Sequence, residues 1–189
     1  MSLYVLALFL HVSGDVGIFI GIGAQLLSLA ALRRAQYVEH VRAIAWLMPI
    51  SDLIGVSSAL LTITTGLYMA LTVWDLQIGW IAVALGSIVV LLPPLIGGVI
   101  EPRTRAIVTM AGEAPDGLLP EALDKRIHDP VLGVALQMMA AVVFGMVFLM
   151  TIKPSLVGSI TVIAVALALG LASGLLFWRT RRWKGKIRI

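Results

Sequence analysis

The chain of 189 residues contains no cysteine and few charged residues, and each scarcity excludes a class of protein. Without cysteine it can form no disulfide, no cysteine-ligated iron–sulfur cluster and no thiolate metal site. Charged residues make up only 13% of the sequence, whereas 60% are hydrophobic and the mean hydropathy is +1.03. A soluble domain of this size exposes most of its residues to water and does not accommodate so much apolar surface. The composition therefore predicts an integral membrane protein.

Five apolar runs follow one another along the chain. They cover residues 3–32, 43–73, 78–100, 131–152 and 156–178. A helix of roughly 20 residues crosses the hydrocarbon core of a bilayer, and each run reaches that length. We therefore expect a single all-α domain, a polytopic membrane helical bundle with five transmembrane helices.

The polar segments lie between and after these runs. The longest, residues 102–129, contains Pro115, Gly117 and Pro120, so it cannot form one continuous helix. We expect it to be a cytoplasmic interfacial connector, with a short helix near its end that turns Ala122, Leu123 and Ile127 toward the bilayer. Residues 179–189 form a basic tail that is expected to attract anionic lipid.

The basic residues are distributed unevenly between the two sides. If the N-terminus is outside, Lys153 is the only one of the 14 lysines and arginines that is not on the inner side. Cytoplasmic segments of membrane proteins carry an excess of Lys and Arg. This pattern predicts that the N-terminus is outside and the C-terminus inside. It also accounts for the net charge of +4 without nucleic-acid binding.

Three ionisable side chains fall inside the expected spans, where charge is costly: His11, Asp15 and Asp52. Counting ~1.5 Å per helical residue places Asp15 and Asp52 at similar depths, with Gln137 of the fourth run nearby. Two neighbouring carboxylates in a low dielectric do not both stay ionised, so one holds a proton or the pair holds a cation. The alternative is a structural polar cluster in which both carboxylates bond to neighbouring helices.

His11 lies one helical turn nearer the outer surface than Asp15. It is a candidate ligand for haem or copper, with Met146 and Tyr68 as candidate partners at that depth. The alternative is a histidine that is hydrogen-bonded to Asp15. The pairs Gly17–Gly21 and Gly170–Gly174 each form a G-x-x-x-G motif, which predicts close contact between helices.

No Walker loop, H-E-x-x-H or G-x-S-x-G motif occurs, so nothing indicates a kinase, a protease or another hydrolase. Three hypotheses for function remain. The first is the handling of protons, a cation or a small solute by the His/Asp cluster. The second is a haem- or copper-binding redox protein. The third is a non-catalytic subunit or assembly factor that docks on a second copy or on another membrane protein.

The run LHVSGDVGIFIGIGAQLLSLAALRR and the later TTGLYMA resemble a bacterial family of integral membrane proteins of unassigned function. Its members open with Leu-His-x-x-Gly and carry Thr-Gly-Leu in the second span. The resemblance covers most of the chain and implies the bacterial plasma (inner) membrane. More distantly, the opening is similar to copper-resistance D-type proteins and to the membrane-type protoporphyrinogen oxidase, which binds haem.

In those two groups a first-span histidine, which matches His11, is implicated in cofactor binding. The resemblance therefore implies haem or copper as the cofactor. The chain departs from these groups because no second histidine lies within an expected span. Asp15 also stands where they more often have an apolar or aromatic residue.

Overall fold

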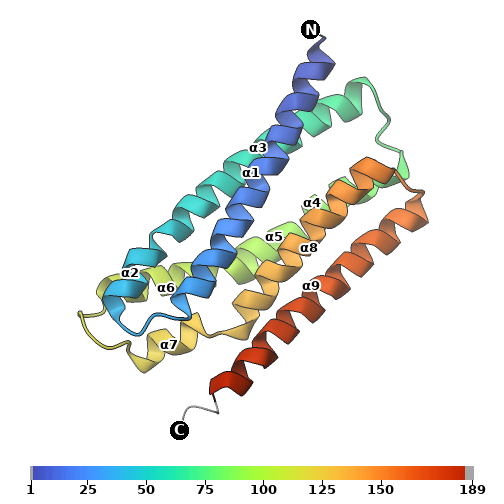
Figure 1. Ribbon diagram of the computed structural model, residues 1–189. Coiled ribbons are helices and arrows are strands. Elements are labelled where there is room, and N and C mark those ends of the chain that lie inside the picture. Colours follow the sequence, from blue (N-terminus) through green and yellow to red (C-terminus); the bar gives the residue numbers. More distant parts are fainter. Residues whose placement is uncertain (1, 186–189) are drawn as a thin grey trace.

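The computed structural model describes the backbone of residues 2–185 and the side chains of residues 2–176. This part of the chain is helical throughout, with an isolated bridge between Tyr37 and Leu118 and no strand (Figure 1). The elements are α1 (Leu3–Leu32), α2 (Val38–Ala45), α3 (Leu47–Thr72), α4 (Gly79–Val90), α5 (Leu92–Leu95), η1 (Ile96–Ile100), α6 (Glu101–Glu113), α7 (Glu121–Ile127), α8 (Pro130–Ile152) and α9 (Leu156–Gly185).

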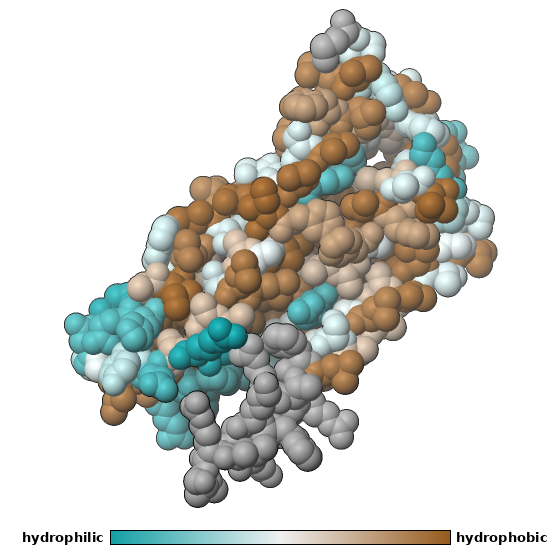
Figure 2. Space-filling view, viewed as in Figure 1, coloured by the Kyte–Doolittle hydropathy of each residue, from teal (hydrophilic) through white to brown (hydrophobic). Residues whose placement is uncertain are grey.

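Within the described residues, five helical segments are long and apolar enough to cross a membrane, as the sequence predicted. They are Leu3–Leu32, Val38–Thr72, Gly79–Glu113, Glu121–Ile152 and Leu156–Leu176. Figure 2 shows apolar residues over the middle of the visible face and polar ones gathered at the end formed by α2, α6 and α7. Such an apolar middle with a polar end suits a protein that is surrounded by lipid.

Helices α1 and α3 pack closely along their length because small residues line their contact. A Cβ added to Gly14 would lie 2.9 Å from the carbonyl oxygen of Ser58, and one added to Gly21 would lie 3.0 Å from the Cα of Gly55. A Cβ on Gly17 would collide with the side chain of Ser58. The first predicted G-x-x-x-G contact is therefore confirmed.

Helices α8 and α9 form a second close pair. A Cβ on Gly170 would lie 2.6 Å from the Cα of Met138, and one on Gly174 would lie 2.7 Å from the Cα of Val134. The second G-x-x-x-G prediction is thus also confirmed. Helix α1 crosses α8, where the rings of Phe19 and Phe144 are 4.6 Å apart, and this contact joins the two pairs.

The third span is interrupted in its middle. Pro93 and Pro94 have no N–H to donate, so the helix breaks after Val90 and restarts at Leu92. A π-helical segment follows over Ile96–Ile100, which contains Gly97 and Gly98. The broken span packs mainly on α8 and α9 rather than on α3.

The expected connector, residues 102–129, is largely helical and includes most of α6 and all of α7. The short helix near its end is present as α7. Its Leu123 and Ile127 are 1% and 0% exposed, so they point into the protein core and not toward the bilayer. The expectation was wrong because residues of α1, α2, α6 and α8 join these two side chains in one hydrophobic cluster.

Two arginines hold this end of the molecule together. Arg42 of α2 donates hydrogen bonds to the carbonyls of Ala111 and Ala114, at 3.1 and 2.8 Å, and pairs with Asp116. Arg33, just after α1, donates to the carbonyls that precede α8. The basic residues at this end therefore contribute to the fold as well as to its charge. Within the expected basic tail, residues 186–189 and the side chains of 179–185 lie outside the described part.

At the opposite end of the molecule, Lys153 lies in the turn between α8 and α9 and contacts the segment between α3 and α4 (Figure 1). Its Nζ lies 4.3 Å from the ring centroid of Trp74, which packs edge-on against Trp80. A cation over an indole face is stabilised by the ring electrons. This contact joins the α8–α9 turn to the segment between α3 and α4.

We expect Gly21→Ala to lower the stability of the protein by about 1–3 kcal/mol. The new Cβ would lie 3.0 Å from backbone atoms of Ser51 and Gly55, which cannot rotate away. The measurement is the Tm of the purified protein in detergent. Gly23→Ala on the same helix is the control, because a Cβ there meets nothing within 4 Å. Equal decreases in Tm for the two variants would contradict this packing.

Candidate functional site

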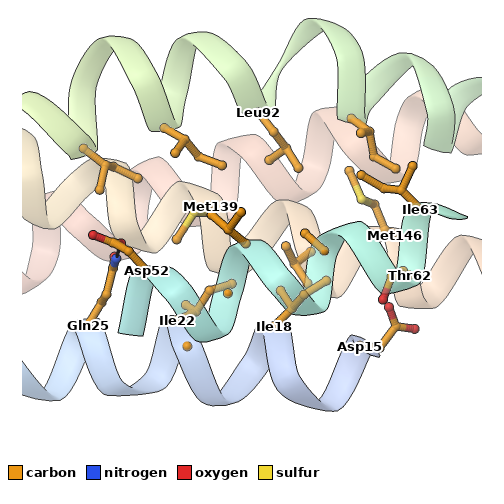
Figure 3. Close-up of a pocket in the computed structure, with 18 of the residues that line it drawn as sticks. Asp15, Ile18, Ile22, Gln25, Asp52, Thr62, Ile63, Leu92, Met139 and Met146 are labelled. Atoms are coloured by element: carbon orange, nitrogen blue, oxygen red, sulfur yellow. Dashed lines mark hydrogen bonds between the residues drawn. The ribbon is translucent and has the colours of Figure 1, made fainter. Parts of the chain in front are cut away.

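A cavity of about 240 Å³ lies between the α1–α3 pair and the broken third span, with α8 contributing to its wall (Figure 3). Most of its lining is aliphatic or methionine: Ile18, Ile22, Val56, Ala59, Ile63, Ile88, Leu92, Ile96, Ile100, Met139, Val143, Met146, Val147 and Met150. The third span contributes residues 88, 92, 96 and 100, which lie one turn apart on one face. The cavity is therefore an apolar chamber between membrane helices.

Polar side chains lie at the two ends of this chamber (Figure 3). Asp15 lies beside Thr62 at one end, and Asp52 lies beside Gln25 at the other. Ten residues of α1 separate Asp15 from Gln25, which is about 15 Å at ~1.5 Å per residue. The structure thus places both predicted aspartates on one cavity but does not bring them into contact.

The antiparallel register of α1 and α3 explains this separation. Gly14 faces Thr62, Gly21 faces Gly55, and Gln25 bonds to Asp52. Asp52 comes early in α3, whereas Asp15 lies near the middle of the 30-residue α1. Counting depth from the ends of the apolar runs gave similar values because those runs extend beyond the ~30 Å that a helix needs to cross.

The surroundings of Asp52 include two residues that we did not predict, Gln25 and Glu101. The amide nitrogen of Gln25 donates a hydrogen bond to Asp52. Gln25 is only 5% exposed, and its amide oxygen has no hydrogen-bond partner. Glu101 begins α6, lines the same cavity and pairs with Arg105.

A signal for Gln25 was present in the sequence. Successive spacings of four, three and four residues connect Gly14, Ile18, Gly21 and Gln25. Gln25 therefore lies on the face of α1 that meets α3 and the cavity. Glu101 had no comparable signal, because it reads as the charged end of an apolar run.

His11 forms a hydrogen bond between helices. Its Nδ1 lies 2.8 Å from the carbonyl oxygen of Thr62, which can only accept, so Nδ1 carries the proton. The hydroxyl of Thr62 donates in return to the His11 carbonyl oxygen, at 3.4 Å. Gly66 provides the necessary space, because a Cβ there would lie 2.7 Å from Cε1 of the imidazole. These contacts make His11 part of the α1–α3 packing.

The two candidate partners of His11, Met146 and Tyr68, have different surroundings. Met146 lines the cavity from α8, whereas His11 is not among the cavity residues. Tyr68 is 38% exposed and does not line the cavity either. Across the described residues, no three His, Cys, Asp or Glu side chains are grouped so that they could hold a metal ion together.

Gln137 lies apart from the two aspartates. It lines a second cavity of about 220 Å³, together with Arg33, Gly133 and Gly174. This cavity lies among α1, α8 and α9. Gln137 therefore does not join the predicted proton or ion site.

No family model, curated protein or solved structure matches this chain. The chemistry of the site therefore has to be read from its geometry. A carboxylate within a membrane helix is costly unless it is protonated or has a cation or donor beside it. An aspartate lies at each end of the cavity, and most of the surface between the two ends is apolar.

We expect Gly66→Ala to lower the Tm because the added methyl group collides with the imidazole of His11. In a His11→Ala background, Gly66→Ala should lower the Tm by less than half as much, because the imidazole ring is absent. A double-mutant cycle of Tm and unfolding free energy measures this difference. A penalty of the same size in both backgrounds would show that His11 does not occupy this position.

Proposed function

We propose that this protein handles protons or a small cationic solute through the cavity between the α1–α3 pair and the third span. The observation that carries the proposal is an apolar chamber among membrane helices with a carboxylate at each end. Ionisable residues inside membrane spans are expensive, and they commonly mark the path of an ion or proton. Asp52 accepts a hydrogen bond from Gln25 and Asp15 lies beside Thr62, but both aspartates also line the cavity, which a purely structural role does not require.

The two aspartates provide positions at different depths. Asp15 lies near the middle of α1, with the hydroxyl of Thr62 beside it. Asp52 lies nearer the end of the bundle that carries α2, α6 and α7. A proton or cation that enters near Asp52 would therefore reach Asp15 by crossing an apolar stretch of about 15 Å.

We further propose that the end formed by α2, α6 and α7 faces the cytoplasm. It carries Arg33, Arg42, Arg103 and Arg105, whereas Lys153 lies at the other end. The positive-inside rule then puts the N-terminus outside and Asp52 toward the cytoplasm. The resemblance to a bacterial membrane protein family supports the plasma (inner) membrane as the location, where anionic lipid would contact this basic end.

The test is proton movement in liposomes that contain the purified protein and an entrapped pH dye. Internal pH is followed under an imposed membrane potential, and then after external addition of Na⁺, K⁺ or an organic ammonium ion. We expect Asp15→Asn and Asp52→Asn each to reduce protein-dependent proton movement at least about tenfold, because an amide has no negative charge and does not take up a proton near neutral pH.

Asp75→Asn is the matched control. Asp75 lies in the segment between α3 and α4, outside the cavity, and accepts a hydrogen bond from the backbone of Gln77. This variant should behave as the wild type does. Equal internal pH in the wild type and in the Asp15→Asn/Asp52→Asn double variant, under every condition, would overturn the proposal.

A further inference from the structure

The end of the cavity at Asp52 offers hydrogen-bond acceptors. The amide nitrogen of Gln25 is used by Asp52, which leaves its oxygen buried and without a partner. Figure 3 shows the side chains of Gln25 and Asp52 pointing toward each other at this end. A buried acceptor without a partner costs stability, so a ligand that brings N–H or O–H donors would complete the site.

The charges at this end favour a monovalent cation. The charged groups that act on Asp52 are Glu101 and Arg105, and these two pair with each other. With both carboxylates ionised, the three side chains carry one net negative charge. One positive charge on a ligand neutralises the group, whereas a divalent ion would leave an excess.

The rest of the cavity favours an organic ligand over an inorganic ion. Between the polar groups at its two ends, the cavity walls are aliphatic and methionine side chains, which cannot replace the water around a metal cation. The volume of about 240 Å³ lies below the common range for drug-sized ligands, ~300–1,000 Å³. A small molecule with an apolar body and a charged head matches both properties.

We propose that this cavity binds a small apolar amine as its ammonium ion. The ammonium N–H groups donate to the Gln25 amide oxygen and to Asp52, and the hydrocarbon part lies along Ile18, Ile22 and Met139. The inference rests on the proposed function and deepens it, because it names the class of cation. Recognition depends on N–H donors, so primary and secondary ammonium ions fit and quaternary ones do not.

The experiment compares hexylamine, hexyltrimethylammonium and 1-hexanol, which share one hydrocarbon chain. Binding to the purified full-length protein in detergent is measured by titration calorimetry. We expect hexylamine to bind at least about tenfold more tightly than hexyltrimethylammonium, since the latter leaves the Gln25 oxygen without a donor. The uncharged 1-hexanol should also bind more weakly than hexylamine.

Substitutions test whether the preference for hexylamine arises at Gln25 and Asp52. Gln25→Leu should weaken hexylamine binding about tenfold and remove its advantage over hexyltrimethylammonium. Gln137→Leu is the matched control, because Gln137 lines the other cavity, and it should bind hexylamine as the wild type does. Asp52→Asn keeps the shape of the side chain and should lose hexylamine binding while it retains that of 1-hexanol.

Equal affinities of the wild type for hexylamine and hexyltrimethylammonium would overturn the inference. Hexylamine binding that survives both Gln25→Leu and Asp52→Asn would also overturn it. If Gln25→Leu does not fold, Asp52→Asn and the comparison of the three ligands decide the question. Proton movement without amine selectivity would refute this inference alone, whereas selective amine binding without any proton movement would refute the transport proposal and retain the binding site.

Discussion

The close contact between α1 and α3 is the constraint on which the rest of the structure depends. Helices in a bilayer gain little from the hydrophobic effect, so their association relies on close packing and hydrogen bonds. Gly14, Gly17 and Gly21 let the two backbones approach, and this approach brings His11 to the Thr62 carbonyl and Gln25 to Asp52. The close packing of α1 on α3 and the Gln25–Asp52 pair therefore belong to one helix–helix contact.

The cavity lies where the third span does not pack closely against the α1–α3 pair. Pro93 and Pro94 break its helix, and the span packs mainly on α8 and α9, so α3 has no close partner on its cavity side. The broken third span and the α1–α3 pair thus line the apolar chamber that separates Asp15 from Asp52.

The basic end of the molecule combines two roles. Hydrogen bonds from Arg42 join α2 to the end of α6, and those from Arg33 join the end of α1 to the segment before α8. Their bonds to backbone carbonyls fix the segments that connect the spans. The same positive charges favour the cytoplasmic side of a membrane. The end that we propose to face the cytoplasm is therefore also held together by arginine hydrogen bonds between its segments, and Glu101 and Asp52 lie next to it.

Length, hydropathy and side-chain size are properties of single segments, so the sequence was enough to predict the five helical spans and the close contacts at both G-x-x-x-G motifs. The same properties singled out the ionisable residues His11, Asp15 and Asp52. How these residues meet depends on the packing of separate helices, which is visible in the folded structure alone. The register of α1 against α3 separated Asp15 from Asp52 and paired Asp52 with Gln25. Packing between several helices turned Leu123 and Ile127 inward. The register of two helices depends on how their surfaces fit together. Counting residues along one helix does not reveal it.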